Sequence, residues 1–289
     1  MKRIKHLVVL AATLISLSRN ASATGDPEDF RITGFTVTNS QGVLAWSGGR
    51  PTYQVQTRSN FTANWSNVGS PTSNTVAVVP ANDAQAYYRV VSDFTARYQV
   101  VFNATWSQAT HPTNWPLNAH WSGLVGGTHN SSVHFFREGE TASEGIRYVA
   151  ELGQKTVLLN EVGAAITNGT TLFQLSGNGI SSSPYFTTYV FPQPMQRDFP
   201  LVTMVTMIAP SPDWFAGVDS LSLVTNGVWA TNLTVTLYGM DAGTDSGASY
   251  GSPDLVTVPR GVVTRFTGFP AIQNGVIVPF GNFTFTRLD

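Results

Sequence analysis

The most constraining feature of this chain is a series of short runs in which apolar and polar residues alternate. Examples from the first third are "FRITGFTVT", "GVLAWSG", "TYQVQTRS" and "AYYRVVSD", and turn residues separate them. Alternation with a period of two places apolar side chains on one face of a strand, and short strands joined by turns favour antiparallel sheets. With 42% hydrophobic and 11% charged residues among 289, the chain can bury a core and is not disordered. The sequence predicts a mainly β protein built as antiparallel β-sandwiches.

Residues 28–93 form one predicted module. Its strand around Trp46, its "YQVQ" strand and its closing "YYRVV" strand resemble fibronectin type III-like modules. Such modules are β-sandwiches of about 100 residues, so this shorter segment is expected to lack a strand. The resemblance implies a spacer beside a larger domain, a pairing common in secreted bacterial proteins.

Residues 94–289 form the second predicted domain. It opens with the alternating strand "RYQVVFNATWS", and "VHFFREG" is a further predicted strand. The segment "SEGIRYVAELGQKTVLLNEVGAAITNG" predicts two short helices, because its apolar residues recur at helical spacing. The two predicted apolar faces are Ile146, Val149 and Ala150, and Leu158, Val162, Ala165 and Ile166. Strands resume after Leu175, so this is a β domain with a small helical insert.

The first 23 residues have the features of a secretory signal peptide. Lys2, Arg3 and Lys5 precede a short apolar run at residues 7–17, and "ASA" at residues 21–23 fits a cleavage site. A membrane anchor is the alternative, but the run is too short to span a bilayer comfortably. We therefore expect a secreted, extracellular protein, or one held in the periplasm or at the cell surface.

The charge and the cysteine content limit the expected classes of partner and the sources of stability. Removing Lys2, Arg3, Lys5 and Arg19 from the 16 basic residues leaves 12 against 17 acidic residues, a formal net charge of −5. No basic cluster remains, so nucleic acid is not an expected partner. The chain has no cysteine, so its stability must come from the core or from a bound ion.

Two loops group the carboxylates of this charge-poor chain. "APSPDWFAGVD" carries Asp213 after the predicted strand at residues 201–209, and "MDAGTDSG" carries Asp241 and Asp245 after the predicted strand at residues 233–239. If these strands run parallel in space, all three carboxylates lie at one end of the sandwich. Close carboxylates repel unless they share a proton or a cation. Calcium accepts six to eight oxygen ligands in irregular geometry, and nearby glycines permit the required turns.

Other interpretations of these aspartates stay open. The EF-hand is excluded, because the loop lacks Asp at its third position and Glu at its twelfth. A catalytic carboxylate pair of a secreted hydrolase is one alternative. In another, the aspartates only cap turns. Asp219 and Asp254 are candidates for an outer shell.

Two long segments resemble the spondin N-terminal domain. They are "FNATWSQATHPTNWPLNAHWSGLVGGTHNSSVHFFREGETASEGIRYVAELG" and "DFPLVTMVTMIAPSPDWFAGVDSLSL", followed by "DAGTDSGASYGSPD". The resemblance covers nearly all of residues 94–289. It implies an antiparallel β-sandwich related to calcium-dependent membrane-binding domains. It also implies a calcium site at the Asp of "PSPDWF" and both Asp of "DAGTD", here Asp213, Asp241 and Asp245. Animal spondins carry other domains with disulfides, so only domain-level properties transfer.

Other residues suggest competing functions. His111, His120, His129 and His134 lie within 24 residues, but their spacing matches no compact zinc motif. Ser131 and Ser132 lack a nucleophile-elbow motif, which argues against a hydrolase triad. Trp214 and Phe215 either bind a membrane surface or a sugar, or are buried, and burial is favoured because large aromatic residues are mostly buried.

Together these observations predict a secreted, calcium-binding, non-enzymatic protein for extracellular adhesion or recognition. Its expected partner is an extracellular protein or glycan. The alternatives are a carbohydrate- or membrane-surface-binding module and a secreted hydrolase that uses the Asp cluster.

Overall fold

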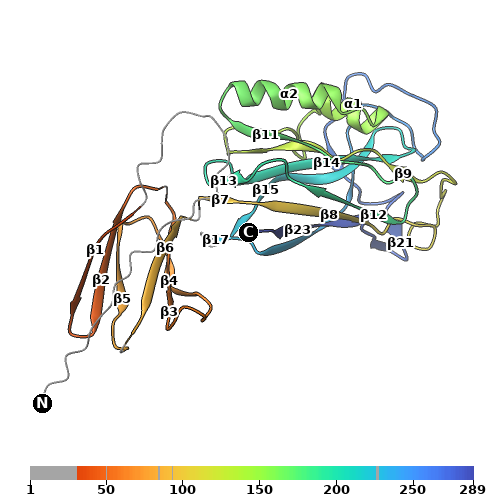
Figure 1. Cartoon of the computed structure of the whole chain (residues 1–289). Helices are drawn as coiled ribbons and strands as arrows, with labels where there is room; N and C mark the ends of the chain where they lie inside the picture. The colour runs from red at the N-terminus through yellow and green to blue at the C-terminus, as the bar shows by residue number, and fades with distance from the viewer. Residues whose placement is uncertain (1–30, 50, 84, 93, 226–227) are drawn as a thin grey trace, which may run out of the picture. The chain divides into compact units, whose positions relative to one another are not determined.

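A computed structural model describes residues 31–49, 51–83, 85–92, 94–225 and 228–289. The predicted signal peptide lies outside these residues. The chain divides between Thr95 and Ala96 into two compact units, which are drawn in Figure 1 and described separately below. In the described part of the chain, neither helix has the length and apolar character needed to cross a membrane.

The first unit contains two three-stranded antiparallel sheets, with strand orders β1-β2-β5 and β4-β3-β6. The strands are β1 (Arg31–Thr38), β2 (Gln41–Ser47), β3 (Tyr53–Arg58), β4 (Ser66–Thr72), β5 (Val76–Pro80) and β6 (Tyr87–Ser92). Alternate residues of β2, among them Leu44 and Trp46, are buried. Trp46 packs edge-on against Tyr53, with ring centroids 5.5 Å apart. The period-two pattern of the sequence therefore produced the expected strands and a small core.

The second unit contains two larger antiparallel sheets. One has seven strands in the order β11-β10-β14-β15-β19-β20, with β9 also paired to β14, and the other has the order β12-β8-β23-β18. The strands of the larger sheet are β9 (His120–Trp121), β10 (Val125–His129), β11 (Thr171–Ser176), β14 (Leu201–Ala209), β15 (Trp214–Ser222), β19 (Gly239–Asp241) and β20 (Thr264–Arg265). Those of the smaller sheet are β8 (Tyr98–Ala104), β12 (Tyr185–Val190), β18 (Asn232–Leu237) and β23 (Gly281–Arg287). Short pairs complete the unit: β7 (Thr95–Ala96) with β13 (Met195–Gln196), β16 (Val224–Thr225) with β17 (Val228–Trp229), and β21 (Ile272–Gln273) with β22 (Val276–Ile277).

Two apolar cores separate this unit into three layers. The larger core joins side chains of both sheets, for example Phe102 of β8, Phe283 of β23 and Met204 of β14. The second core joins the opposite face of the seven-stranded sheet, including Val205 and Phe215, to the helices. Consecutive residues of a strand point to opposite faces, which explains why Met204 and Val205 enter different cores. Figure 1 shows both helices lying over one face of the larger sheet.

Both predicted helices are present, as α1 (Glu144–Leu152) and α2 (Thr156–Thr167). The Ser143 side chain caps α1 by accepting a hydrogen bond from the Ile146 amide. The predicted apolar faces are buried, except that Ile166 near the end of α2 is 37% exposed. The prediction for Ile166 was therefore wrong.

Two strand predictions also differ from the structure. Residues 133–139 form turns and coil, although Phe135 and Phe136 are buried in the core under the helices. The run at residues 233–239 is divided: β18 ends at Leu237 in the smaller sheet, and β19 begins at Gly239 in the larger one. A Cβ atom at Gly239 would lie 2.4 Å from the Phe266 ring, so glycine allows the chain to pass between the sheets here.

Candidate metal centre

The three predicted aspartates lie close together, but not at the ends of two parallel strands. Asp213 lies in the turn between β14 and β15, and Asp241 is the last residue of β19. Strand β19 pairs with β15 so that Trp214 faces Asp241, and the Ala242 amide donates to the Asp213 carbonyl oxygen at 3.1 Å. Cross-strand pairing within one sheet therefore brings the two loops together.

Asp213 is fully buried, and its two carboxylate oxygens differ in their hydrogen bonds. Oδ2 accepts hydrogen bonds from the amides of Thr244 at 2.7 Å and Asp245 at 3.0 Å, and from the Thr244 hydroxyl at 3.2 Å. Oδ1 has no hydrogen-bond partner among the described residues. Burial, and then the negative charge of Asp241, raise the pKa of Asp213 to about 6. A buried oxygen with no partner destabilises the fold, so this position favours a proton or a cation.

Asp241 and Asp245 shape the loop that follows β19. Asp241 Oδ1 accepts from the Gly243 amide at 2.7 Å. Burial raises the pKa of Asp241, although hydrogen bonds from Gly243 and Trp214 oppose the rise. Asp245 is buried, and its two oxygens accept from the amides of Gly247 and Leu255, each at 2.7 Å. These carboxylates therefore cap turns, as the turn interpretation expects, and their further lone pairs are compatible with a cation.

The loop is held by a close backbone approach at Gly243. This residue has φ +74°, and a Cβ atom there would lie 2.7 Å from the Gly261 carbonyl carbon. The Gly261 amide donates to the Gly243 oxygen at 2.7 Å. Only glycine adopts this conformation freely while leaving that space, so the glycine of "DAGTD" fixes the backbone between the two aspartates.

The residues present fit a hard cation in part. Within the described residues, no three His, Cys, Asp or Glu side chains already form a metal-binding group. What fits is the unpartnered, buried Asp213 Oδ1 beside the negative charge of Asp241. Carboxylate oxygens are ligands that calcium prefers, and backbone carbonyls or water commonly complete its shell.

Trp214 and Phe215 are buried, as the sequence favoured, with 3% and 0% of their surface exposed. The Trp214 ring packs edge-on against those of Tyr250 and Phe266, each with centroids 5.2 Å apart. Neither residue is therefore available to contact a membrane or a sugar. The most exposed apolar side chains of this region are instead Leu255, Val256 and Val258, which the sequence analysis missed although the run "LVTV" indicates them.

The four histidines do not converge. His111 is buried against the Phe280 ring, with centroids 4.3 Å apart, and burial lowers its pKa to about 4. The ring nitrogens of His129 bond to the Asn130 carbonyl and the Thr203 hydroxyl, each at 2.8 Å. Both ring nitrogens of His129 therefore have partners other than Ser131 and Ser132, so this histidine does not activate either serine.

His120 bonds to the Asn118 carbonyl oxygen at 2.7 Å, and His134 pairs with Glu140 at 2.7 Å. Asp219 accepts a hydrogen bond from the Ser220 hydroxyl at 2.7 Å. His120 and His129 thus bond to backbone carbonyl oxygens, whereas His134 pairs with a side chain and His111 Nδ1 lies 3.0 Å from the Thr110 hydroxyl oxygen.

Comparison with known proteins identifies the second unit. Residues 96–275 match the model of the Spondin_N family. The chain is a spondin N-terminal domain protein. It is 35% identical to rat spondin-2 over 214 residues, which cover 67% of this chain and 62% of the rat protein. Human spondin-2 is 37% identical over 182 residues, 60% of this chain and 53% of the human protein.

Human spondin-1 is 32% identical over 192 residues, covering 65% of this chain but 24% of that protein. The chain thus spans less than two thirds of the relatives it matches. These spondins are secreted extracellular matrix proteins, in agreement with the secreted location that the sequence predicts.

Proposed function

We propose that this spondin-type protein is a secreted, non-enzymatic adhesion or recognition protein whose second unit binds calcium through Asp213, Asp241 and Asp245. The observation that carries the proposal is the buried, unpartnered Oδ1 of Asp213, next to the charge of Asp241. A calcium ion would give this oxygen a partner and reduce the repulsion between the carboxylates. The extracellular matrix relatives support an adhesion or recognition role.

In this proposal calcium orders the loop that follows β19 and positions it for recognition. The segment after Asp245 is tied to it by the bond from the Leu255 amide and by the bridge between Asp245 and Val256. A cation at Asp213 and Asp241 would hold the same turn from its other side. The partner is an extracellular protein or glycan. The fibronectin type III-like first unit serves as a spacer, and that pairing favours a bacterial source.

The test is calcium titration by calorimetry on chelator-stripped protein. Wild type is expected to give saturable heat that Asp213→Asn and Asp241→Asn remove, because each variant deletes a charged ligand while keeping the shape of the side chain. Asp198→Asn is the matched control, since Asp198 is an exposed aspartate outside these loops. Heat that survives in the triple Asp→Asn variant, or no heat from metal-free wild type, would contradict the proposal.

A membrane surface is a second candidate partner, supported by one observation. Leu255, Val256 and Val258 are 59%, 73% and 86% exposed on the loop tied to Asp245. Clustered exposed apolar side chains mark interaction sites. Calcium-dependent sedimentation of the protein with anionic vesicles would support a membrane partner if Val256→Ser abolishes it. Val276→Ser, at an exposed valine outside this loop, should leave the sedimentation unchanged. Saturable heat of calcium binding without vesicle sedimentation would contradict the membrane partner and still support the calcium site.

A further inference from the structure

Two arginines of the first unit lie over one tryptophan. The Cζ atoms of Arg58 and Arg89 are each 4.4 Å from the centroid of the Trp65 ring. Arg58 is the last residue of β3, Arg89 lies in β6, and Trp65 directly precedes β4. All three strands of the sheet β4-β3-β6 therefore contribute to this cluster, and the two positive charges meet only through the fold.

The arginines lie on the outer face of this sheet. Val55 of β3 is buried in the core of the unit. Residues two apart in a strand share a face, so Gln56 and Arg58 lie together on the face opposite Val55. Gln56 pairs with Arg89 of β6 on one side and with Asn67 of β4 on the other. The outer face thus carries a polar row that crosses all three strands.

Hydrogen bonds along this face orient the arginines and leave donors unused. Arg89 Nε donates to Gln56 Oε1 at 2.8 Å, and the Gln56 amide donates to Asn67 Oδ1 at 2.9 Å. Arg58 Nη1 donates to the Phe61 carbonyl oxygen at 3.0 Å, and Arg58 Nε is buried without a partner among the described residues. Neither guanidinium donates another hydrogen bond to that part of the chain. Guanidinium groups offer only donors, so the complementary ligand is rich in acceptors.

No carboxylate of the described residues neutralises these arginines. Residues 31–95 contain four arginines and two aspartates, although acidic residues outnumber basic ones by 17 to 16 in the whole chain. Asp83 is the one carboxylate in the described part of this unit, and it forms no ion pair with either arginine. Burial, and then the charge of Arg58, lower the pKa of Arg89. A bound anion would relieve this repulsion.

An exposed aromatic ring borders the arginines. Phe61 is 59% exposed, and its ring lies 4.5 Å from that of Tyr87 and 5.3 Å from Arg58 Cζ. Aromatic rings present an apolar face, on which the apolar face of a sugar can lie, and the exposed Asn67 supplies an amide for sugar hydroxyls. An acidic sugar has a carboxylate, an apolar ring face and hydroxyls in one unit. An acidic peptide side chain has only the first of these, so the cluster favours the sugar.

We propose that the outer face of the sheet β4-β3-β6 binds a polysaccharide that contains uronate. Its carboxylates pair with Arg58 and Arg89, and a neighbouring sugar ring lies on Phe61. Trp65 is a positioning residue, because cation–π contacts use the faces of the guanidinium groups and leave their in-plane N–H groups free. The first unit then binds a partner besides serving as a spacer. No residue of the calcium proposal takes part, so the two proposals stand independently.

The probe is fluorescent tetragalacturonate, titrated onto the full chain in chelator and followed by anisotropy. We expect saturable binding that weakens as salt is added, because salt screens exposed charges. The methyl ester of the same oligosaccharide keeps the rings and hydroxyls without the charge, and it should bind about tenfold more weakly because the charge-assisted hydrogen bonds are lost. No saturable binding of tetragalacturonate to wild type, or equal binding of acid and ester, would overturn the proposal.

Variants of the arginines locate the site. Arg58→Gln and Arg89→Gln should each weaken tetragalacturonate binding about tenfold, because each removes a charged donor group. Arg31→Gln is the matched control, since Arg31 is an exposed arginine of the same unit in the other sheet, and it should leave binding unchanged. Undiminished binding in the double variant Arg58→Gln/Arg89→Gln would contradict the proposal.

Calorimetry separates binding from packing on Trp65. Saturating tetragalacturonate should raise the melting temperature of the first unit in wild type and in Arg31→Gln. The same transition, measured without ligand, shows whether Arg58→Gln and Arg89→Gln are folded. Arginines that only pack on Trp65 would lower this transition when replaced, while wild type would gain no stability from the oligosaccharide, and that result would overturn the proposal.

An acidic peptide is the rival occupant. Tetraglutamate carries side-chain carboxylates but no sugar ring, so we expect it to bind more weakly than tetragalacturonate. Phe61→Ala removes an exposed ring without changing the charge, and it should weaken binding of the sugar alone. Tetraglutamate that binds as tightly as the sugar, with Phe61→Ala affecting neither ligand, would assign the site to acidic proteins and overturn the proposal.

Discussion

At the scale of single residues, a substitution of Asp213 distinguishes two possible roles of this side chain, that of a metal ligand and that of a turn cap. Its pKa, raised from 3.8 to about 6, means that the folded chain holds its proton more tightly than the unfolded chain. The unfolding free energy of the metal-free protein therefore falls as pH rises from about 4 to about 6, and the loss is complete at pH 7. We predict that Asp213→Asn, which carries no charge, makes the metal-free protein more stable at pH 7 by on the order of 2 kcal/mol.

Urea unfolding of chelator-treated proteins at pH 7 measures this difference. With saturating calcium the order should reverse, because only the wild type gains binding free energy. If Asp213 serves only to accept hydrogen bonds from Thr244 and Asp245, the variant should instead be less stable in both conditions. The two interpretations thus predict opposite signs in the metal-free protein.

His111 gives the opposite dependence on pH. Burial lowers its pKa from 6.5 to about 4, so between these values the unfolded chain binds a proton that the folded chain does not. Stability contributed by neutral His111 is present above pH 6.5 and is lost as pH falls toward 4. We predict that His111→Gln flattens the fall of unfolding free energy between pH 6.5 and pH 4, by up to about 1.4 kcal/mol per pH unit.

Urea unfolding at several pH values checks the His111 prediction. Above pH 7 the side chain is neutral in both states, so the difference between wild type and variant should be constant there. A difference that stays constant down to pH 4 would show that His111 protonates as readily in the fold as in the unfolded chain.

At the scale of elements, Glu161 joins the two helices. From α2 it accepts hydrogen bonds from the Ser143 hydroxyl at 2.8 Å and the Gly145 amide at 2.7 Å, so it satisfies donors at the start of α1. We predict that Glu161→Ala lowers the unfolding free energy by about 1–3 kcal/mol, because buried donors lose their partner. Chemical denaturation of wild type and variant measures this loss of unfolding free energy.

Glu151→Ala is the control for this contact. Glu151 pairs with Arg147 one turn away within α1, at 2.8 Å, and such i,i+4 pairs contribute about 0.3–0.5 kcal/mol. Similar losses in the two variants would show that the inter-helix contact adds nothing beyond an ordinary pair within one helix.

The elements also show where sequence patterns succeed. Strand β14 begins and ends where its apolar run predicts, and the helices follow their 3.6-residue spacing. The division of the run at residues 233–239 could not be predicted, because both halves alternate equally well. Only tertiary packing against Phe266 places Gly239 in the other sheet. The β15–β19 pairing, and with it the contact of Asp213 with the "DAGTD" loop, depends on that division.

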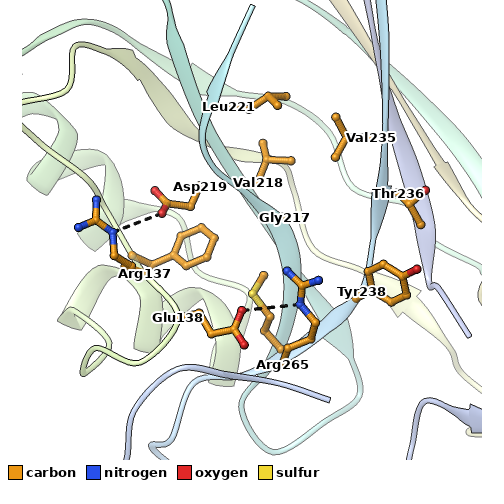
Figure 2. A pocket seen from close by; sticks show the side chains of 12 residues that line it. Arg137, Glu138, Gly217, Val218, Asp219, Leu221, Val235, Thr236, Tyr238 and Arg265 are labelled. Carbon is orange, nitrogen blue, oxygen red and sulfur yellow. Dashed lines mark ion pairs between the residues drawn. The ribbon is translucent and has the colours of Figure 1, made fainter. Parts of the chain in front are cut away.

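At the scale of the molecule, sequence patterns predicted two β units but not the cavity beside β15 and β18. The motifs pointed to Asp213, Asp241 and Asp245, which do lie together. Arg137 and Arg265 both line this cavity (Figure 2), but they lie far apart in sequence and come together only through the fold.

The two units have separate cores. Leu44, Trp46 and Tyr53 belong to a cluster within the first unit, and both larger clusters lie wholly within the second. A unit with its own core can fold independently. We therefore predict that a fragment of residues 94–289, which retains β7, keeps the thermal transition and the calcium response of the second unit in the full chain.

Differential scanning calorimetry of the full chain and the fragment tests this independence. The full chain should show two transitions, of which the fragment retains one within a degree or two, since about 1 kcal/mol shifts the midpoint by about 2–4 °C in a domain of this size. Calcium should raise that retained transition equally in both proteins, because all three aspartates lie in the fragment. A fragment that melts several degrees lower would mean that the first unit stabilises the second and is more than a spacer.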